Sequence, residues 1–537
     1  MKTKPTGKMP VEPKFDGRRP KGKDVIFGPA AITALLMMGV AVMLVRFVYT
    51  ANAGEQNSKP DQTTQNETEI APIYLTDGEI CGIWSAVDYI KTENLEDFDP
   101  KKPEYTELGV KLPYYLAEFF SDGTLTVKAS NSSGEAVYNW INGDTLDILS
   151  GISELITVRE IRQIGGKDYM FVDFSAAQLI PEAPQGYYVF SRRKTKYVYG
   201  GDDVQNKDLR NYNFSEAWDL HTVSFNEDTI FPPALQKTAL STMKRGQNPG
   251  LGVRALHERG ITGKGVNVAI IDEPLDMGHP EYAGKIIEYK DFSGEADFSS
   301  QGSGVAGLLA GESMGTAPGV NIYYAAVPAW DMYDARYYAL ALDWIIELNS
   351  GLPEDEKIKA VCISPNPENP LPWINVEEYL ISFMRAEKEG ILVLDCTDEH
   401  GVALGACSYD YENPEDVSLC KPKGAYRIAI APYHYDGEAK EIFTGEEPNE
   451  NMLRVPISYK TLPETGEDSS YKYRYDTKGQ LSWALPYATG VLAMGWQLSP
   501  ELGGDKMIEI LFDTAYIDKS GNKYINPKAF IEQLENN

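Results

Sequence analysis

From about Asn248 onward, short apolar stretches alternate with segments of helical length, and this alternation restricts the possible folds most strongly. Val266–Asp272 (VNVAIID) and Val320–Ala326 (VNIYYAA) are continuous apolar runs, which is typical of strands buried on both faces of a sheet. Ala335–Leu348 and Val376–Gly390 have helical length and spacing, and the second ends at a glycine. The pattern predicts an α/β domain whose parallel sheet is flanked by helices.

Residues 75–196 show a different pattern, in which aromatic and β-branched residues partly alternate over several short stretches. Ser121-Asp122-Gly123 and Gly165-Gly166 stand between such stretches, as hairpin turns require. The segment therefore predicts a separate β-rich domain, a small barrel or a sandwich. It also resembles the lipocalin-like modules of bacterial envelope proteins, in its opening Gly82–Trp84 and in the stretches YMFVDF and YYVF. Its aromatic residues are expected in the core, and no site is assigned to it.

The chain opens with a basic tail followed by an uncharged run, Val25–Val45. A helix needs about 20 apolar residues to cross a membrane, whereas the apolar region of a signal peptide has about 7–15. We therefore expect an uncleaved transmembrane helix, with the basic tail in the cytoplasm and the folded domains outside the plasma membrane. A cleaved signal peptide is the alternative, since Ala51 and Ala53 supply small residues for cleavage.

The net charge of the chain limits the classes of partner that it can bind. The chain has 50 Lys and Arg against 79 Asp and Glu, a net charge of −29. Because the first 46 residues carry +6, the remainder carries −35. Such acidity argues against a nucleic-acid binder and favours solubility beside an anionic envelope. The expected organisation is a basic cytoplasmic tail (1–24), a transmembrane helix (25–48), a linker (49–74), the β-rich domain (75–196), a connecting segment (197–243) and the α/β domain (244–537).

Three motifs of the α/β domain carry polar residues at strand ends and helix starts. In VAIIDEPLDMGHPE, Asp272 ends an apolar strand, where a carboxylate is directed into the crevice at the sheet edge. In QGSGVAGLLAG, small residues follow Gln301 and open a helix. In LSWALPYATGVLA, Ser482 begins a helix, beside free backbone N–H groups that suit a developing oxyanion.

Together and in this order, the motifs resemble those of the subtilisin-like serine peptidases, the subtilases, whose triad runs Asp, His, Ser along the chain. The resemblance covers Asn248–Gln497, and extends to membrane-anchored subtilases of Gram-positive bacteria that have a β-rich domain before the peptidase domain. It implies a subtilisin-like fold, with Asp272 as the triad carboxylate, Ser482 as the nucleophile and Gln301 at the histidine position.

Gln301 is the main departure from the family. Attack by a serine hydroxyl requires a base that takes its proton and later protonates the leaving amine. A glutamine amide does neither. In subtilisin, loss of the serine or the histidine alone lowers turnover about a million-fold. We therefore expect a catalytically impaired member of the family, a pseudopeptidase that acts by binding a peptide or protein.

A second departure concerns the oxyanion hole. Subtilases carry an asparagine after the strand that corresponds to Ile391–Asp395, and the resemblance places Asp398 or Glu399 there. A carboxylate repels a forming oxyanion instead of donating to it. Two alternatives stay open: an active serine endopeptidase that uses Asp272 and Ser482 with a non-standard base such as His400, and a structural envelope protein.

No cofactor is predicted. Of the five cysteines, Cys396, Cys407 and Cys420 lie within 25 residues, and no CxxC pair indicates zinc. A disulfide between two of the three suits an oxidising exterior, but the spacing does not say which two. Subtilases often bind calcium through loop carboxylates. The acidic loop residues lack the spacing of a calcium-binding EF-hand and fit a solvated loop better; they are Asp410, Glu412, Glu415 and Asp416.

Overall fold

The computed structural model describes most of the chain from residue 75 onward. The described ranges are 75–90, 95, 98–101, 116–128, 133–149, 153–175, 186–214, 219–294, 297–328, 333–364, 373–395, 403–423, 452–466 and 469–536. The expected membrane span Val25–Val45 and the loop residues Asp398, Glu399 and His400 lie outside them. Within these ranges, no helix combines the length and the apolar character needed to cross a bilayer.

The β-rich segment forms a closed barrel of eight antiparallel strands, in which each strand pairs with the next and the last returns to the first. The prediction of a β-rich domain is confirmed, and the barrel form is the correct one. The strands are β1 (Gly82–Ile90), β2 (Leu116–Phe119), β3 (Thr124–Lys128), β4 (Ser133–Trp140), β5 (Thr145–Leu149), β6 (Ser153–Ile164), β7 (Lys167–Asp173) and β8 (Tyr187–Arg192).

Several contacts join Trp84 of the barrel to the short helix before it. This indole is fully buried, and its Nε1 donates to the carbonyl of Ile80 at 2.6 Å, in the short helix α2 (Asp77–Ile80). The guanidinium of Arg192 lies over the indole ring, 4.2 Å from its centroid, and donates to the carbonyl oxygens of Cys81 and Glu79. The aromatic residues of this domain thus serve the core, as Tyr169 and Phe171 also do.

The segment between the barrel and the α/β body packs against a hairpin of that body. Its strand β11 pairs with β21, which in turn pairs with β20. Tyr475 of the hairpin shares a core with Leu220 and Phe225 of the segment. The elements involved are β9 (Tyr197–Val198), β10 (Asn213–Phe214), η5 (Leu220–Thr222), β11 (Phe225–Asn226), α3 (Pro233–Gly246), β20 (Lys460–Thr465) and β21 (Tyr471–Asp476).

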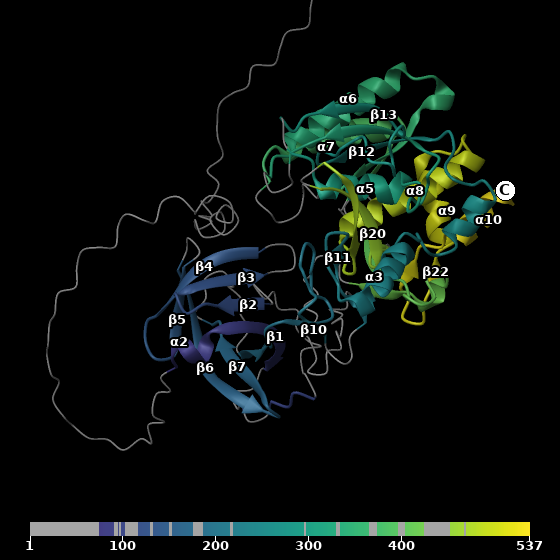
Figure 1. Ribbon diagram of the computed structural model, residues 1–537. Coiled ribbons are helices and arrows are strands. Elements are labelled where there is room, and N and C mark those ends of the chain that lie inside the picture. Colours follow the sequence, from purple (N-terminus) through teal and green to yellow (C-terminus); the bar gives the residue numbers. More distant parts are fainter. Residues whose placement is uncertain are drawn as a thin grey trace, which may run out of the picture.

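The α/β body is built on a five-stranded parallel sheet with the order β13-β14-β12-β15-β16. Figure 1 labels two of its strands, β12 and β13. Strand β12 is central, and all six of its residues are buried between β14 and β15. This confirms the predicted parallel sheet. The strands are β12 (Asn267–Asp272), β13 (Ile286–Asp291), β14 (Asn321–Ala326), β15 (Ile358–Ile363) and β16 (Leu392–Leu394).

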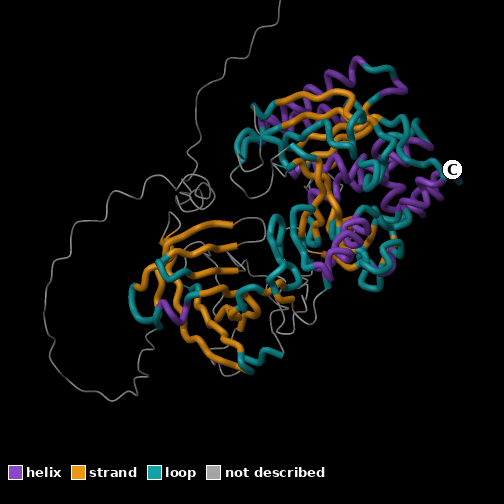
Figure 2. Tube along the Cα trace, in the orientation of Figure 1, coloured by secondary structure: helices purple, strands orange, loops and turns teal. Residues whose placement is uncertain are grey.

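Helices cover both faces of this sheet (Figure 2). Val268 and Ile270 of β12 share a core with α5 and α8, whereas Ala269 and Ile271 share the opposite core with α6 and α7. The helices and short helical turns of the body are α4 (Val253–Glu258), α5 (Ser300–Ala310), α6 (Arg336–Gly351), η7 (Glu354–Glu356), α7 (Val376–Lys388), η9 (Leu481–Trp483), α8 (Ala484–Leu498), α9 (Gly504–Asp513) and α10 (Pro527–Glu535).

A second sheet with the order β18-β17-β19-β23-β22 completes the body. Strand β17 runs parallel to β19 and antiparallel to β18. The elements are β17 (Ala403–Ser408), η8 (Val417–Leu419), β18 (Lys421–Lys423), β19 (Met452–Pro456), β22 (Tyr516–Ile517) and β23 (Lys523–Tyr524).

Candidate active site

Asp272 is the last residue of the central strand β12, and its side chain is buried. Its Oδ1 accepts a hydrogen bond from the backbone N–H of Glu273 at 2.7 Å. Burial raises the pKa of Asp272 to about 7, against the lowering effect of the neighbouring Ser364 hydroxyl. No cation is among the described groups that shift this pKa. The Asp272 side chain therefore lies at the carboxyl-terminal edge of the sheet without the positive charge that usually stabilises a buried anion.

Helix α5 begins directly beside the residue that follows Asp272. The Ser299 hydroxyl caps the helix by accepting from the N–H of Gln301 at 3.0 Å, and it also donates to the carboxylate of Glu273. At Gly302, an added Cβ would lie 2.2 Å from the carbonyl oxygen of Glu273. Only glycine allows this approach, so the small-residue motif brings the start of α5 against the end of β12.

Ser482 lies in the η9 turn that leads directly into α8, and it is partly exposed. The next residue, Trp483, is buried with its ring against α5, where a Cβ added to Gly304 would lie 2.8 Å from it. Its indole Nε1 donates to Asp476 Oδ2 at 3.0 Å. Trp483 thus fixes the turn that presents Ser482 against the helix that carries Gln301.

The side chain of Gln301 is engaged by a second glutamine. The Gln480 side-chain amide donates to the side-chain carbonyl of Gln301, which ties the start of α5 to a residue two positions before Ser482. Within the part of the chain that the structure describes, no hydrogen bond joins the Ser482 hydroxyl to a side chain that can accept its proton. Gln301 therefore makes an amide–amide contact with the turn that carries Ser482, and an amide is not a base.

Two histidines of the α/β body, His257 and His279, lie against backbone carbonyl groups. His257 Nε2 lies 2.8 Å from the carbonyl oxygen of Thr316, and burial lowers its pKa. His279 Nε2 lies 3.3 Å from the carbonyl oxygen of Lys472, and burial lowers its pKa as well. Neither contacts Asp272 among the described interactions, so neither supplies the missing base there.

His221 belongs to the segment before the α/β body. Its ring stacks on Tyr411 with centroids 4.1 Å apart, and its Nδ1 lies 2.8 Å from Asp219 Oδ1. None of its described contacts is with Asp272 or Ser482. His400 and His434 lie outside the described residues.

The four loop carboxylates considered for calcium each have a protein partner. Within the described ranges, no three His, Cys, Asp or Glu side chains are grouped as metal ligands. The partners are Asn413 for Asp410, Arg245 for Glu412, Asn248 and Gly252 for Glu415, and Ser418 for Asp416.

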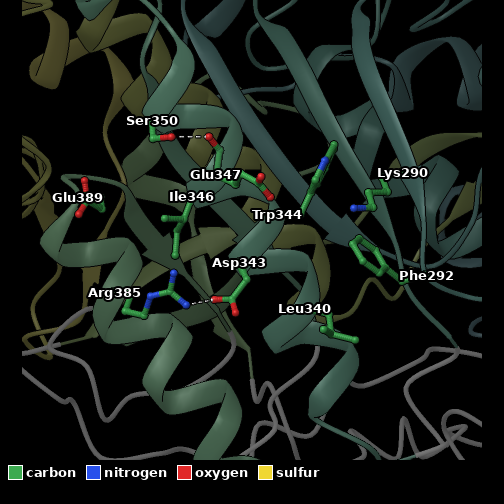
Figure 3. Close-up of a pocket in the computed structure, with 10 residues that line it drawn as sticks. All are labelled: Lys290, Phe292, Leu340, Asp343, Trp344, Ile346, Glu347, Ser350, Arg385 and Glu389. Atoms are coloured by element: carbon green, nitrogen blue, oxygen red, sulfur yellow. Dashed lines mark hydrogen bonds and ion pairs between the residues drawn. The ribbon is translucent and has the colours of Figure 1, made fainter.

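A pocket of about 540 Å³ lies apart from these residues, between β13 and the outer sides of α6 and α7 (Figure 3). Arg385 and Asp343 form an ion pair at 2.6 Å across it, and Lys290 lies over the ring of Phe292, 5.0 Å from its centroid. Its lining includes none of the motif residues, so it does not belong to the candidate active site.

Sequence reasoning missed Gln480, Trp483 and Ser364. Gln480 directly precedes the serine motif and Trp483 lies within it, but their partners Gln301 and Gly304 are far away in the chain, and no local pattern connects them. Ser364 directly follows the strand β15 beside β12, so its position at a strand end was the available signal.

A parallel sheet covered on both faces, with an aspartate ending the central strand and a serine at a helix start, is the framework of an α/β serine peptidase. Residues 263–530, half of the chain, match the subtilase family (peptidase S8). This body belongs to the subtilase family, as its motifs predicted.

Curated relatives agree with this assignment. Subtilisin-like protease PopC of Myxococcus xanthus is 22% identical over 305 residues, which cover 53% of this chain and 62% of that protein. The major intracellular serine protease of Bacillus subtilis is 24% identical over 253 residues, covering 44% of this chain and 70% of that protein. Among solved structures, fervidolysin from Fervidobacterium pennivorans, a keratinolytic enzyme, shows 16% identity and a TM-score of 0.38, covering 54% of this chain and 47% of that chain.

Proposed function

We propose that the subtilase body binds a peptide or protein segment in the crevice of Asp272 and Ser482 and does not complete its hydrolysis. The observation that carries this proposal is the hydrogen bond between Gln480 and Gln301. An amide, which does not take up a proton near neutral pH, stands at the position where the family needs a base, and the contact with Gln480 ties it to the serine turn.

The missing base has a large effect on rate. A loss of about a million-fold in turnover corresponds to ~8 kcal/mol of activation free energy, which the serine and the aspartate alone do not recover. Asp272 does not substitute for the base, because no hydrogen bond among the described residues joins its carboxyl group to Ser482. The family's binding of peptides does not depend on the base, so recognition survives the loss of hydrolysis.

We also propose that the chain is anchored in the plasma membrane. A helix over Val25–Val45 would anchor the chain in the plasma membrane, with the barrel and the subtilase body on the outer side. We also propose that the barrel is a lipocalin-like module, on the resemblance of its opening Gly82–Trp84. A pseudopeptidase so placed would bind extracytoplasmic peptides or proteins near the membrane.

The test measures binding and cleavage on the same samples. The full chain in detergent is incubated with fluorescent unfolded casein, beside Ser482→Ala and a matched control, Ser350→Ala, on the outer helix α6. We expect saturable binding in all three proteins and no casein fragments above the Ser482→Ala background. Absence of binding would favour a purely structural role. Cleavage that disappears only in Ser482→Ala would establish an active peptidase with another base.

A further inference from the structure

Cys407 and Cys420 lie next to one another in the second sheet. Strands β17 and β18 pair antiparallel with Cys407 opposite Pro422 and Ser408 opposite Lys421. Cys420 directly precedes β18, so it is the diagonal neighbour of Cys407 on the same face of the ladder. Both side chains are buried in the core of the subtilase body.

The two thiols also influence one another. Burial raises the pKa of Cys407 well above its usual value, and the neighbouring Cys420 thiol raises it further. Both are free thiols in the structure. Cys407 on β17 and Cys420 just before β18 are diagonal neighbours in the same core, so a side-chain adjustment brings the two sulfur atoms to bonding geometry.

Two buried cations stand close to this pair. The Lys460 ammonium donates to the carbonyl of Pro249 at 2.9 Å, and the Arg454 guanidinium donates to Asn522 Oδ1 at 3.1 Å. Each lowers the pKa of Cys407 through its charge, although burial outweighs them. Positive charge beside a thiol favours the thiolate, which is the attacking species in disulfide exchange.

We propose that Cys407 and Cys420 are joined as a structural disulfide when the chain folds in the presence of a disulfide donor. One thiolate attacks the donor, such as oxidised glutathione, and releases one glutathione thiol; the second thiolate attacks the mixed disulfide and releases the other. Two protein thiols are oxidised, one donor disulfide is reduced, and the two protons leave on the released thiols.

The bond would close the loop between Cys407 and Cys420, which contacts the first residues of the subtilase body. Within this loop, Glu412 forms an ion pair with Arg245 at 3.0 Å, and the carbonyl of Pro414 accepts from the N–H of Leu251 at 2.9 Å. A cross-link between the loop ends restricts the unfolded chain and so favours these contacts.

The full chain, refolded in detergent with a glutathione redox buffer, tests the proposal. After denaturation and alkylation without reductant, we expect a linked peptide pair that contains Cys407 and Cys420, and alkylated Cys81 and Cys362. Alkylation of Cys407 or Cys420, or linkage of either to Cys396, would overturn the proposal. This readout uses the natural chain and does not depend on a variant that folds.

Variants provide a second readout. Reductant should lower the thermal unfolding temperature of the natural chain and of the matched control Cys81→Ser by the same amount, because Cys81 lies in the barrel near Tyr138. Cys407→Ser and Cys420→Ser should each remove this dependence on reductant. An unchanged dependence in either serine variant contradicts the proposed pair.

Discussion

The side-chain amide of Gln480 donates to the side-chain carbonyl of Gln301, across 179 residues of sequence. This contact joins the start of α5 to the turn that holds Ser482. In a subtilase triad the residue at position 301 has to receive a proton from the serine. In the alignment that we propose, this position holds a glutamine, whose amide is not a base, so the proton path of the triad is incomplete.

Replacing Gln301 by histidine should restore part of the missing chemistry. The Gln480 amide is placed to donate to the new ring, in competition with the Ser482 hydroxyl. We therefore expect Gln301→His to give slow casein cleavage, and the double variant with Gln480→Ala to exceed it by about ten-fold, which is ~1.4 kcal/mol of activation free energy. The measurement is the initial rate of fragment release. Equal rates in the single and double variants would show that Gln480 does not compete.

Asp272 should make stability depend on pH. Its pKa of about 7 in the folded state lies above its ordinary value of about 3.9, so the folded state binds the proton more tightly. This stabilising contribution is complete below about pH 4 and is lost as the pH rises through 7. The free energy of unfolding of the natural chain should fall relative to Asp272→Asn by at most ~1.4 kcal/mol per pH unit in this window.

Urea unfolding of both proteins between pH 4 and 8 measures this difference. A difference that stays constant with pH would mean that Asp272 is ionised throughout, as it would be beside a cation. Ser364→Ala supplies a further check. Loss of the hydroxyl that stabilises the carboxylate should move the pH-dependent change to higher pH.

The contact of Trp483 with Gly304 should tolerate no added methyl group. A Cβ at Gly304 would lie 2.8 Å from the indole ring, so the ring and the Ser482 turn must shift. We expect Gly304→Ala to lower the free energy of unfolding by about 1–3 kcal/mol. Gly351→Ala is the matched control, because nothing lies within 4 Å of its added Cβ. Equal stability of the two variants in urea would refute this packing role.

The barrel has its own test at Arg192. Its guanidinium stacks on Trp84 and donates to the carbonyl oxygens of Cys81 and Glu79. Arg192→Ala should destabilise the barrel by about 2 kcal/mol, since a ring contact and charged hydrogen bonds are lost together. Arg159→Ala, at an exposed ion pair, should have an effect below about 1 kcal/mol. Calorimetric thermal unfolding of the two variants beside the natural chain distinguishes them.

The parallel sheet could be predicted because β12 and β14 are apolar on both faces, a pattern that an exposed strand does not show. The choice between a barrel and a sandwich could not be predicted. Alternation of apolar and polar residues indicates the two faces of a strand, but it does not show that β8 pairs with β1 to close the sheet. The motifs located Asp272, Gln301 and Ser482 in the sequence. The partner of Gln301 and the environment of Asp272 depend on contacts between distant segments, which no local pattern records.

The most direct test of the missing base is the dependence of casein cleavage on Ser482. The full chain and Ser482→Ala, purified in parallel, are compared for fragment release over an extended incubation. We predict indistinguishable traces, because no hydrogen bond among the described residues joins the Ser482 hydroxyl to a base. Fragments that appear with the natural chain and vanish with Ser482→Ala would contradict it.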